Sequence, residues 1–354
     1  MSESFAVYGA QVTPELMRFA VNYQAVRGIS LLNFMVISYD RKTPMCLQYR
    51  PNFNNSNPGM DCLAQINTYT ARLSDILQKG RPDISTALYF PFRSICAGGK
   101  KGKEAEIAFE TLGKYLEDQG VSFDLIDEDF VLTAKKQNGA LIGKYVRYDH
   151  VFVPDAFLEK EEVLQKLDGL NKQMEPCILR QSKHILARKI LLSEEESLYL
   201  ICNFANEAVS ETVGIPSCKC PYLVDLQSGE LLLPEYEQDD AYIKIPVTLL
   251  RGEAVAVYLT DRPQSAKQKA KYEPYVRLQE FRSCVSREYR LNVEYGPQNA
   301  YPKLCLKSDM LSPWDPAFSG EVTYLTTLPE LPEEDLQLSL GQVNHFAKAD
   351  KQNY

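Results

Sequence analysis

The run ARLSDILQKG (residues 71–80), followed by ISTALYFPF (residues 84–92), decides the fold of this chain. The first run repeats apolar side chains at helical spacing and ends at a glycine, which is typical of an amphipathic helix. The second run is a short apolar segment with the length of a buried strand. Both belong to a stretch from Cys62 to Pro154 in which strands alternate with helices, and this alternation predicts a parallel sheet with right-handed crossovers.

The same alternation continues along the stretch and just beyond it. An apolar helical face recurs over residues 105–116, short strands are expected at 123–126 and 150–153, and a further helix begins near residue 158. We interpret residues 61–186 as a small flavodoxin-like α/β domain.

The residues before this domain predict one helix and one strand. Thr13 can N-cap a helix whose first residue is Pro14, and Gly28 marks its expected end. The run LLNFMVI (31–37) has the composition of a strand buried on both faces, as in a parallel sheet or barrel. Two elements cannot form a core alone. Residues 1–60 therefore either join the following domain or belong to a barrel whose other elements are absent.

The pattern changes to β after Lys189. Short strands separated by turns predict an antiparallel β-sandwich over residues 187–262. Residues 261–272 are polar and rich in lysine, which is typical of a linker. Residues 263–354 contain a few further strands, such as EVTYLTTL (321–328), and we interpret them as an incomplete second β-sandwich.

Composition and charge exclude several classes of protein. A net charge of −8 over 354 residues argues against binding to nucleic acid, whose phosphates are neutralised by Lys and Arg. No apolar run approaches the roughly 20 residues that span a bilayer, and residues 1–9 lack the features of a signal peptide. The nine cysteines are scattered, which favours reduced thiols. We expect a cytoplasmic protein that binds neither nucleic acid nor membranes.

Glu3 is the first candidate for a catalytic residue. It lies in SESFAVYG (2–9), just before the helix that begins at Pro14, where a barrel strand would present the side chains of its carboxyl end. Active sites of (β/α)8 barrels use these strand ends, and glycosidases require two carboxylates beside the scissile bond. The alternative is that Glu3 belongs to a solvated terminus.

Four further residues are candidates for substrate binding. Ser38, Tyr39 and Asp40 close the apolar strand, where Tyr39 could stack on a sugar ring. The spacing of the sequence does not identify the second carboxylate, although Asp40 lies at a topologically sensible position for it. Asn33 is polar within an apolar run, so it needs a hydrogen-bond partner if it is buried. A structural contact for Asn33 is the alternative to a contact with ligand.

Two other motifs do not meet the requirements of the sites that they resemble. The segment AGGKKGK (97–103) lacks the glycine spacing and the Ser or Thr of a phosphate loop, and it is expected to be a mobile, solvated loop. Cys218 and Cys220 lack the second pair of ligands that zinc requires. A small-molecule site that uses the loop after Phe92 remains a third alternative for the function.

Several stretches together resemble a known family, large multidomain bacterial glycoside hydrolases of the α-L-rhamnosidase kind, related to enzymes with β-galactosidase-type barrels. The stretches that carry this resemblance are residues 2–40, 66–92, 148–157, 202–213, 224–230 and 318–328. One departure is NFMVISY (33–39), where relatives tend to carry a histidine.

The resemblance implies both a domain order and a chemistry. In such enzymes a (β/α)8 barrel precedes a flavodoxin-like domain and β-sandwiches, so residues 1–60 would be partial barrel elements and residues 263–354 a partial galactose-binding-like region. The chain would then be the C-terminal portion of a glycoside hydrolase. It would act on carbohydrate through two carboxylates, one of them Glu3, and in some relatives calcium binds at the sugar.

Two consequences of this interpretation remain open. An incomplete barrel has an open sheet edge, which is compatible with a homo-oligomer. An incomplete barrel also gives no reason to expect catalysis by this chain alone. The alternative function is a noncatalytic carbohydrate-binding or scaffold module.

Overall fold

The computed structural model describes residues 1–6, 8, 12–35, 53 and 62–268, together with the strands at 286–290 and 321–325. The chain divides into two compact units, Met1–Lys269 and Ala270–Tyr354. In the second unit, β19 (Ser286–Arg290) pairs antiparallel with β20 (Glu321–Leu325). All other helices and strands of the described residues belong to the first unit.

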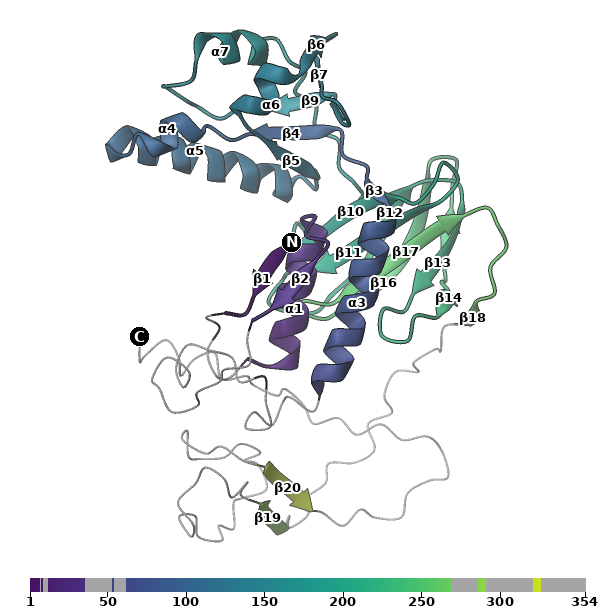
Figure 1. Ribbon diagram of the computed structural model, residues 1–354. Coiled ribbons are helices and arrows are strands. Elements are labelled where there is room, and N and C mark those ends of the chain that lie inside the picture. The colour runs from purple at the N-terminus through teal and green to yellow at the C-terminus, as the bar shows by residue number, and fades with distance from the viewer. Residues whose placement is uncertain are drawn as a thin grey trace. The chain divides into compact units, whose positions relative to one another are not determined.

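A seven-stranded sheet, which we call the first sheet, lies at the centre of the first unit (Figure 1). Its strands follow the order β18-β14-β13-β17-β11-β10-β3, and all neighbours are antiparallel except β14 and β18. In chain order the strands are β3 (Arg81–Pro82), β10 (Ile185–Leu191), β11 (Ser197–Asn203), β13 (Cys220–Val224), β14 (Leu231–Leu233), β17 (Ala254–Thr260) and β18 (Lys267–Gln268).

A second sheet packs on one face of the first. It has the order β12-β16-β15 and is antiparallel throughout, with β12 at Val209–Pro216, β15 at Glu237–Gln238 and β16 at Tyr242–Leu249. Tyr199 and Ile201 of β11 share one buried cluster with Val213, Ile215 and Ile245 of this sheet. The two sheets therefore enclose a common apolar core, as facing sheets do when their inward side chains interdigitate.

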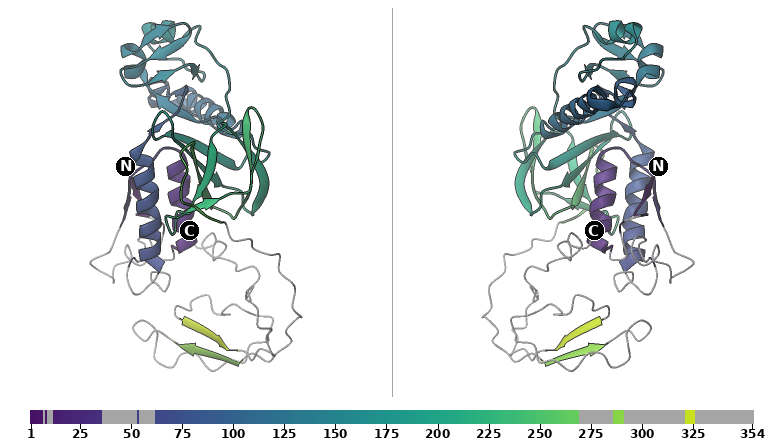
Figure 2. Two further views of the ribbon diagram at one scale, coloured as in Figure 1. Left: turned by 90° about the vertical axis from the view of Figure 1, so that its right-hand side faces the viewer. Right: turned by 90° about the vertical axis from the view of Figure 1, so that its left-hand side faces the viewer.

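Two helices cover the other face of the first sheet and lie side by side (Figures 1 and 2). They are α1 (Pro14–Val26) and α3 (Leu63–Lys79). As the sequence predicts, Thr13 caps α1, because its Oγ1 accepts a hydrogen bond of 3.2 Å from the amide of Leu16. Gly28 follows the helix with a φ of +97°, a left-handed conformation that favours glycine.

The position of α3 differs from the sequence interpretation, which places residues 61–80 in the flavodoxin-like domain. Its buried Tyr69 and Leu73 share a core with Met17 and Val21 of α1 and with Leu200 of β11. An amphipathic helix specifies that one face is buried but does not specify the surface that covers it. Here α1 and the first sheet supply that surface.

A three-stranded parallel sheet forms the centre of a separate α/β layer, in the order β5-β4-β9. Leu88 faces a cluster that includes Leu116 of α5, whereas Ala87 faces a cluster that includes Val131 of α6 and Val163 of α7. The helices therefore cover both faces of the sheet. The elements are β4 (Thr86–Tyr89), α4 (Phe92–Cys96), α5 (Gly99–Asp118), β5 (Phe123–Ile126), α6 (Glu128–Thr133), β9 (His150–Phe152) and α7 (Glu161–Leu167).

A small antiparallel meander also belongs to the α/β layer, although the sequence interpretation omits it. Its strands are β6 (Lys135–Gln137), β7 (Ala140–Ile142) and β8 (Arg147–Tyr148). The turn between the first two contains Asn138 and Gly139, with φ values of 51° and 74°. An Asn-Gly pair is the strongest short-range signal for a hairpin with a two-residue loop, so the sequence does indicate this hairpin.

The segment 97–103 corrects another expectation. It is not an extended mobile loop, because most of it forms the first turn of α5, directly after the short helix α4. Gly98 and Gly99 have φ values of 66° and 62°, and they let the chain reverse between the two helices. The strand β10 likewise begins at Ile185, before the predicted boundary between residues 186 and 187.

The first unit is thus a mixed α/β structure with several sheets, as the sequence predicts at this level. Within the described residues, β1 (Ser2–Ser4) and β2 (Leu32–Phe34) form a separate two-stranded parallel sheet and not a closed barrel. In the same part of the chain, no helix combines the length and the apolarity needed to cross a bilayer.

Replacing Leu200 with alanine tests the two-sided packing of the first sheet. The side chain of Leu200, on β11, is fully buried between the first sheet and the helices α1 and α3. Leu200→Ala should therefore lower the free energy of unfolding by about 2–5 kcal/mol. Leu125→Ala removes a leucine that is 59% exposed and should cost less than about 1 kcal/mol. Urea unfolding monitored by circular dichroism measures both, and equal losses would contradict this packing.

Candidate functional site

The candidate site is carried by the unit β1–α1–β2. The two strands are parallel, and their register places Glu3 opposite Asn33. The amide of Ser2 donates to the carbonyl of Leu31, and the amide of Met35 donates to the carbonyl of Ser4, each at 2.9 Å. The structure therefore brings together two predicted site residues that are 30 positions apart in the sequence.

The two faces of this strand pair differ in their surroundings. Ser4 is buried against α1, where the amide of Gln24 donates a hydrogen bond of 3.1 Å to its hydroxyl. Because side chains alternate along a strand, Glu3 and Asn33 lie on the opposite face, and both are exposed. Asn33 makes a weak contact of 3.8 Å from its Nδ2 to Met35 Sδ.

The roles of these residues stay predictions. Glu3 and Asn33 share one exposed face of the strand pair. Ser38, Tyr39 and Asp40, the other predicted site residues, lie outside the described residues.

A strained residue follows β1 directly. Phe5 has a φ of 76°, which is rare for a residue with a side chain. Its side chain is only 1% exposed. Its ring makes edge-to-face contacts with Tyr8 at 5.2 Å, Phe34 at 5.0 Å and Phe53 at 6.2 Å between centroids. Strain of this kind persists only where the surroundings enforce it, and it is concentrated at functional sites. No sequence signal indicates this conformation.

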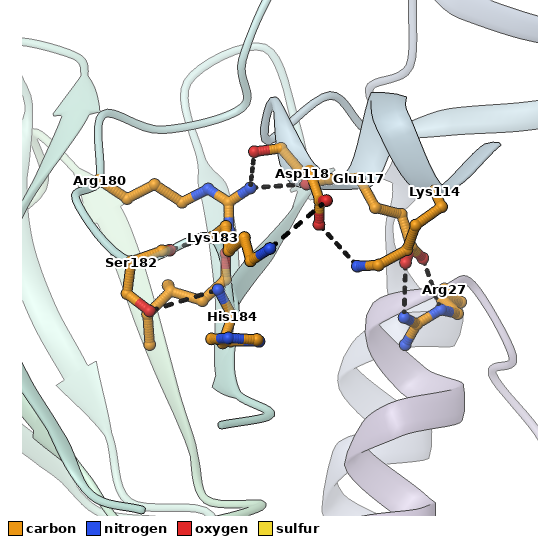
Figure 3. A network of polar contacts seen from close by, with 9 residues as sticks. Arg27, Lys114, Glu117, Asp118, Arg180, Ser182, Lys183 and His184 are labelled. Atoms are coloured by element: carbon orange, nitrogen blue, oxygen red, sulfur yellow. Dashed lines mark hydrogen bonds and ion pairs between the residues drawn. The ribbon is translucent and has the colours of Figure 1, made fainter. Parts of the chain in front are cut away.

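An ion pair ties the end of α1 to the α/β layer (Figure 3). Arg27, which follows α1, donates from Nε to Glu117 Oε1 at 2.8 Å and from Nη2 to Oε2 at 3.0 Å. The guanidinium also lies 3.7 Å from the centroid of the Tyr23 ring. We call this bidentate pair the Arg27–Glu117 latch. Fork-like pairs of this type are more specific than single contacts.

A second arginine secures the same end of α5 (Figure 3). Arg180 Nη2 donates to the carbonyls of Glu117 at 2.6 Å and Asp118 at 3.2 Å, and Nη1 donates to the carbonyls of Ser182 and Ile185. A cation at a helix C-terminus satisfies carbonyls that have no partner within the helix. The hydrogen bond from Lys114 lowers the pKa of the Asp118 carboxyl. The network joins α1, α5 and the segment that leads into β10.

The carboxyl end of β4 is the other region where a ligand could be expected. Ligands of open parallel sheets bind at carboxyl ends where the chain connects to both sides, and β4 lies between β5 and β9. Here Glu159 is buried, and its carboxylate accepts from Tyr89 at 2.5 Å and from the Ser94 hydroxyl at 2.8 Å. Burial, followed by the contact with Glu159, raises the pKa of Tyr89. These groups form hydrogen bonds with one another, which favours a structural role for them.

Glu128 forms a charged cluster beside that region. It pairs with Arg93 and, at 2.5 Å, with Lys160. Hydrogen bonds from Arg93 and Lys160 lower the pKa of the Glu128 carboxyl to about 2.

The family resemblance includes relatives in which calcium binds at the sugar. No group of three or more His, Cys, Asp or Glu side chains among the described residues could hold a metal ion.

The latch can be tested by a double-mutant cycle of Arg27→Ala and Glu117→Ala. The side chains are only 28% and 21% exposed, so we expect a coupling energy of about 1 kcal/mol or more. The exposed pair Lys79–Asp75 is the control and should give no more than about 0.5 kcal/mol. Chemical unfolding measures each variant, and a coupling no larger than in the control pair would show that the latch contributes nothing specific.

The Glu128 cluster predicts a dependence of stability on pH. A carboxyl whose pKa is lowered in the folded state stabilises the fold above its unfolded value of 4.5, and this contribution is lost as the pH falls toward 2. Glu128→Gln should therefore lower Tm at neutral pH, and the difference from the wild type should shrink between pH 4.5 and pH 2. Thermal unfolding across pH measures this difference. In a background lacking the Arg93 and Lys160 side chains, the same substitution should have a smaller effect, and an unchanged effect would contradict the assignment.

Comparisons with known proteins place the fold. Neither a protein-family model nor a curated protein sequence matches the chain. Among solved structures, the chain is similar to a rhamnosidase from Novosphingobium sp. PP1Y, with a TM-score of 0.53 and 12% sequence identity. The match covers 78% of this chain and 32% of the rhamnosidase, so the chain spans about a third of that enzyme's length.

A second similar structure is an exo-carrageenase of the GH42 class from Bacteroides ovatus, with a TM-score of 0.44 and 10% identity over 70% of this chain and 39% of that one. A score below 0.5 carries no argument about the fold by itself. The similarity to the rhamnosidase shows that this chain shares a fold with part of that enzyme.

Proposed function

We propose that this chain is part of a glycoside hydrolase and that Glu3 supplies one of its two catalytic carboxylates. The observation that carries the proposal is the parallel pairing of Glu3 with Asn33 on the face of β1 and β2 that is turned away from α1. In a (β/α)8 barrel the helices cover the outside, and the opposite face of the strands lines the interior. The fold shared with part of a rhamnosidase supports this assignment.

The chemistry assigns a role to each site residue. Glu3 acts as the nucleophile or as the acid/base, and Asp40 is the candidate for the second carboxylate. The separation of the two carboxyl groups decides the stereochemical course, since about 5–5.5 Å favours retention and about 6.5–9.5 Å favours inversion. The Asn33 amide and the Ser38 hydroxyl would hydrogen-bond sugar hydroxyls, and Tyr39 would stack on the sugar ring. The rhamnosidase indicates rhamnosides as the first substrates to test.

The domain assignment belongs to the same proposal. Residues 1–60 would supply barrel elements, 61–186 a flavodoxin-like domain, 187–262 a β-sandwich and 263–354 a partial galactose-binding-like region. The chain spans only about a third of the rhamnosidase, which supports the interpretation as one part of a larger enzyme. The packing of α3 on α1 suggests that the first boundary should follow this helix.

Replacing Glu3 with glutamine tests the proposal directly. The change keeps the size of the side chain but removes the charge and the proton-transfer group, so kcat should fall by about 10²–10⁴-fold. Release of p-nitrophenol from p-nitrophenyl α-L-rhamnopyranoside and a panel of related aryl glycosides measures turnover. The assay uses this chain and any longer version of the protein. Glu104→Gln, an exposed carboxylate on α5, is the matched control and should keep full activity.

The outcomes separate the two functions under consideration. Unchanged turnover in Glu3→Gln would remove Glu3 from the site. Glycan binding without hydrolysis by any wild-type version would favour the alternative, a noncatalytic carbohydrate-binding or scaffold module.

A further inference from the structure

A cavity of about 230 Å³ opens at one end of the two facing sheets. Its wall on the first sheet is formed by Lys189 and Leu191 of β10 and by Ser197 and Tyr199 of β11. Lys189 lies opposite Tyr199 in the strand register, and Leu191 lies opposite Ser197, so the four side chains share one face. The turn between these strands and the segment after β12 complete the rim. The cavity therefore combines rigid strand residues with two connecting segments.

Tyr199 is the most informative residue in the cavity wall. It is 1% exposed and lines the cavity, and within the described part of the chain no side-chain hydrogen bond contributes to the electrostatics of its hydroxyl. Lys189 Nζ lies 5.9 Å from the centroid of its ring. Burial raises the pKa of the Tyr199 hydroxyl, which therefore remains protonated and available as a donor. A phenolic hydroxyl in a cavity wall can donate to a bound molecule, so this position suits a ligand that bears a hydrogen-bond acceptor.

The charges around the cavity cancel. Two ammonium groups, Lys189 and Lys219, and two carboxylates, Glu194 and Glu196, line it. Lys189 is also paired with Asp83 at 2.6 Å, and Lys219 donates to a backbone carbonyl at 2.5 Å. This balance favours a neutral ligand over an anion. Three hydroxyl groups add donors and acceptors at the rim and wall, from Ser193, Ser197 and Ser217.

We propose that this cavity binds a single neutral sugar residue, such as the terminal residue of a glycan. The volume is below the roughly 300–1,000 Å³ of sites for drug-sized ligands, which limits the occupant to about one ring. The wall offers the mixture of hydroxyl, ammonium and carboxylate groups that a polyhydroxylated ring can match on several sides. None of the lining residues belongs to β1 or β2, so this site goes beyond the proposed function and does not depend on Glu3.

Saturation-transfer NMR on the full chain tests the site with L-rhamnose, D-galactose and D-glucose as probes. At least one sugar should bind saturably. Tyr199→Phe retains the ring in the core and removes only the hydroxyl, so it should weaken that binding by about three- to tenfold. Lys219→Ala should weaken it as well, because it removes a donor at the rim. Tyr145→Phe removes a hydroxyl from a residue that is 82% exposed elsewhere and should leave binding unchanged.

Each outcome supports or overturns the site. Saturable binding that falls in Tyr199→Phe and Lys219→Ala but not in Tyr145→Phe supports it. No saturable binding of the three sugars, or binding that neither cavity variant changes, overturns it. Binding of inorganic phosphate in preference to all three sugars overturns the assignment to a neutral ligand. Thermal unfolding of Tyr199→Phe distinguishes a lost contact from a lost fold. Because Glu3→Gln leaves the cavity intact, sugar binding should persist in that variant even if the proposed catalysis fails.

Discussion

The two-sided burial of β11 is the constraint on which the first unit depends. All seven residues from Ser197 to Asn203 are buried, and successive side chains enter two different cores. Leu198, Leu200 and Cys202 face α1 and α3, whereas Tyr199 and Ile201 face the second sheet. Because side chains alternate strictly along a strand, a shift of one residue would exchange the two sets and would disrupt both cores at once. This register therefore holds the helices and the second sheet in one arrangement.

Two buried asparagines extend this arrangement to the candidate site. Asn203, at the end of β11, donates to the carbonyl of Leu249 at 2.9 Å, and its own carbonyl accepts from the amide of Gly252 at 2.8 Å. The carbonyl of Gly252 in turn accepts from Asn22 of α1 at 2.9 Å, and Asn22 accepts from Tyr69 at 2.7 Å. Buried polar groups that are fully paired in this way specify one geometry. The turn between β16 and β17 thus fixes α1, the helix that connects β1 with β2.

The position of Glu3 follows from these contacts. The core and Asn22 hold α1 from the sheet side, and the Arg27–Glu117 latch holds its C-terminal end against α5. The catalytic role proposed for Glu3 would require supporting residues that hold its carboxylate within fractions of an ångström. In this structure that support reaches Glu3 through β1, Ser4 and Gln24. The cavity beside Tyr199 lies at one end of the core between the two sheets, away from β1 and β2. The register of β10 and β11 determines which of their side chains line it.

Local chemistry in the sequence determined several elements. Thr13, Pro14 and Gly28 set the limits of α1, and short apolar runs located β5 and β9, because caps and hydrophobic periodicity act over a few residues. The sequence also carried the resemblance to glycoside hydrolases. Only the tertiary structure decided that α3 packs on α1, that Glu3 faces Asn33, and that Tyr199 lines a cavity. These facts depend on strand register and on which apolar surfaces meet. Both are settled by contacts between residues far apart in the chain, and a local pattern carries no information about its distant partner.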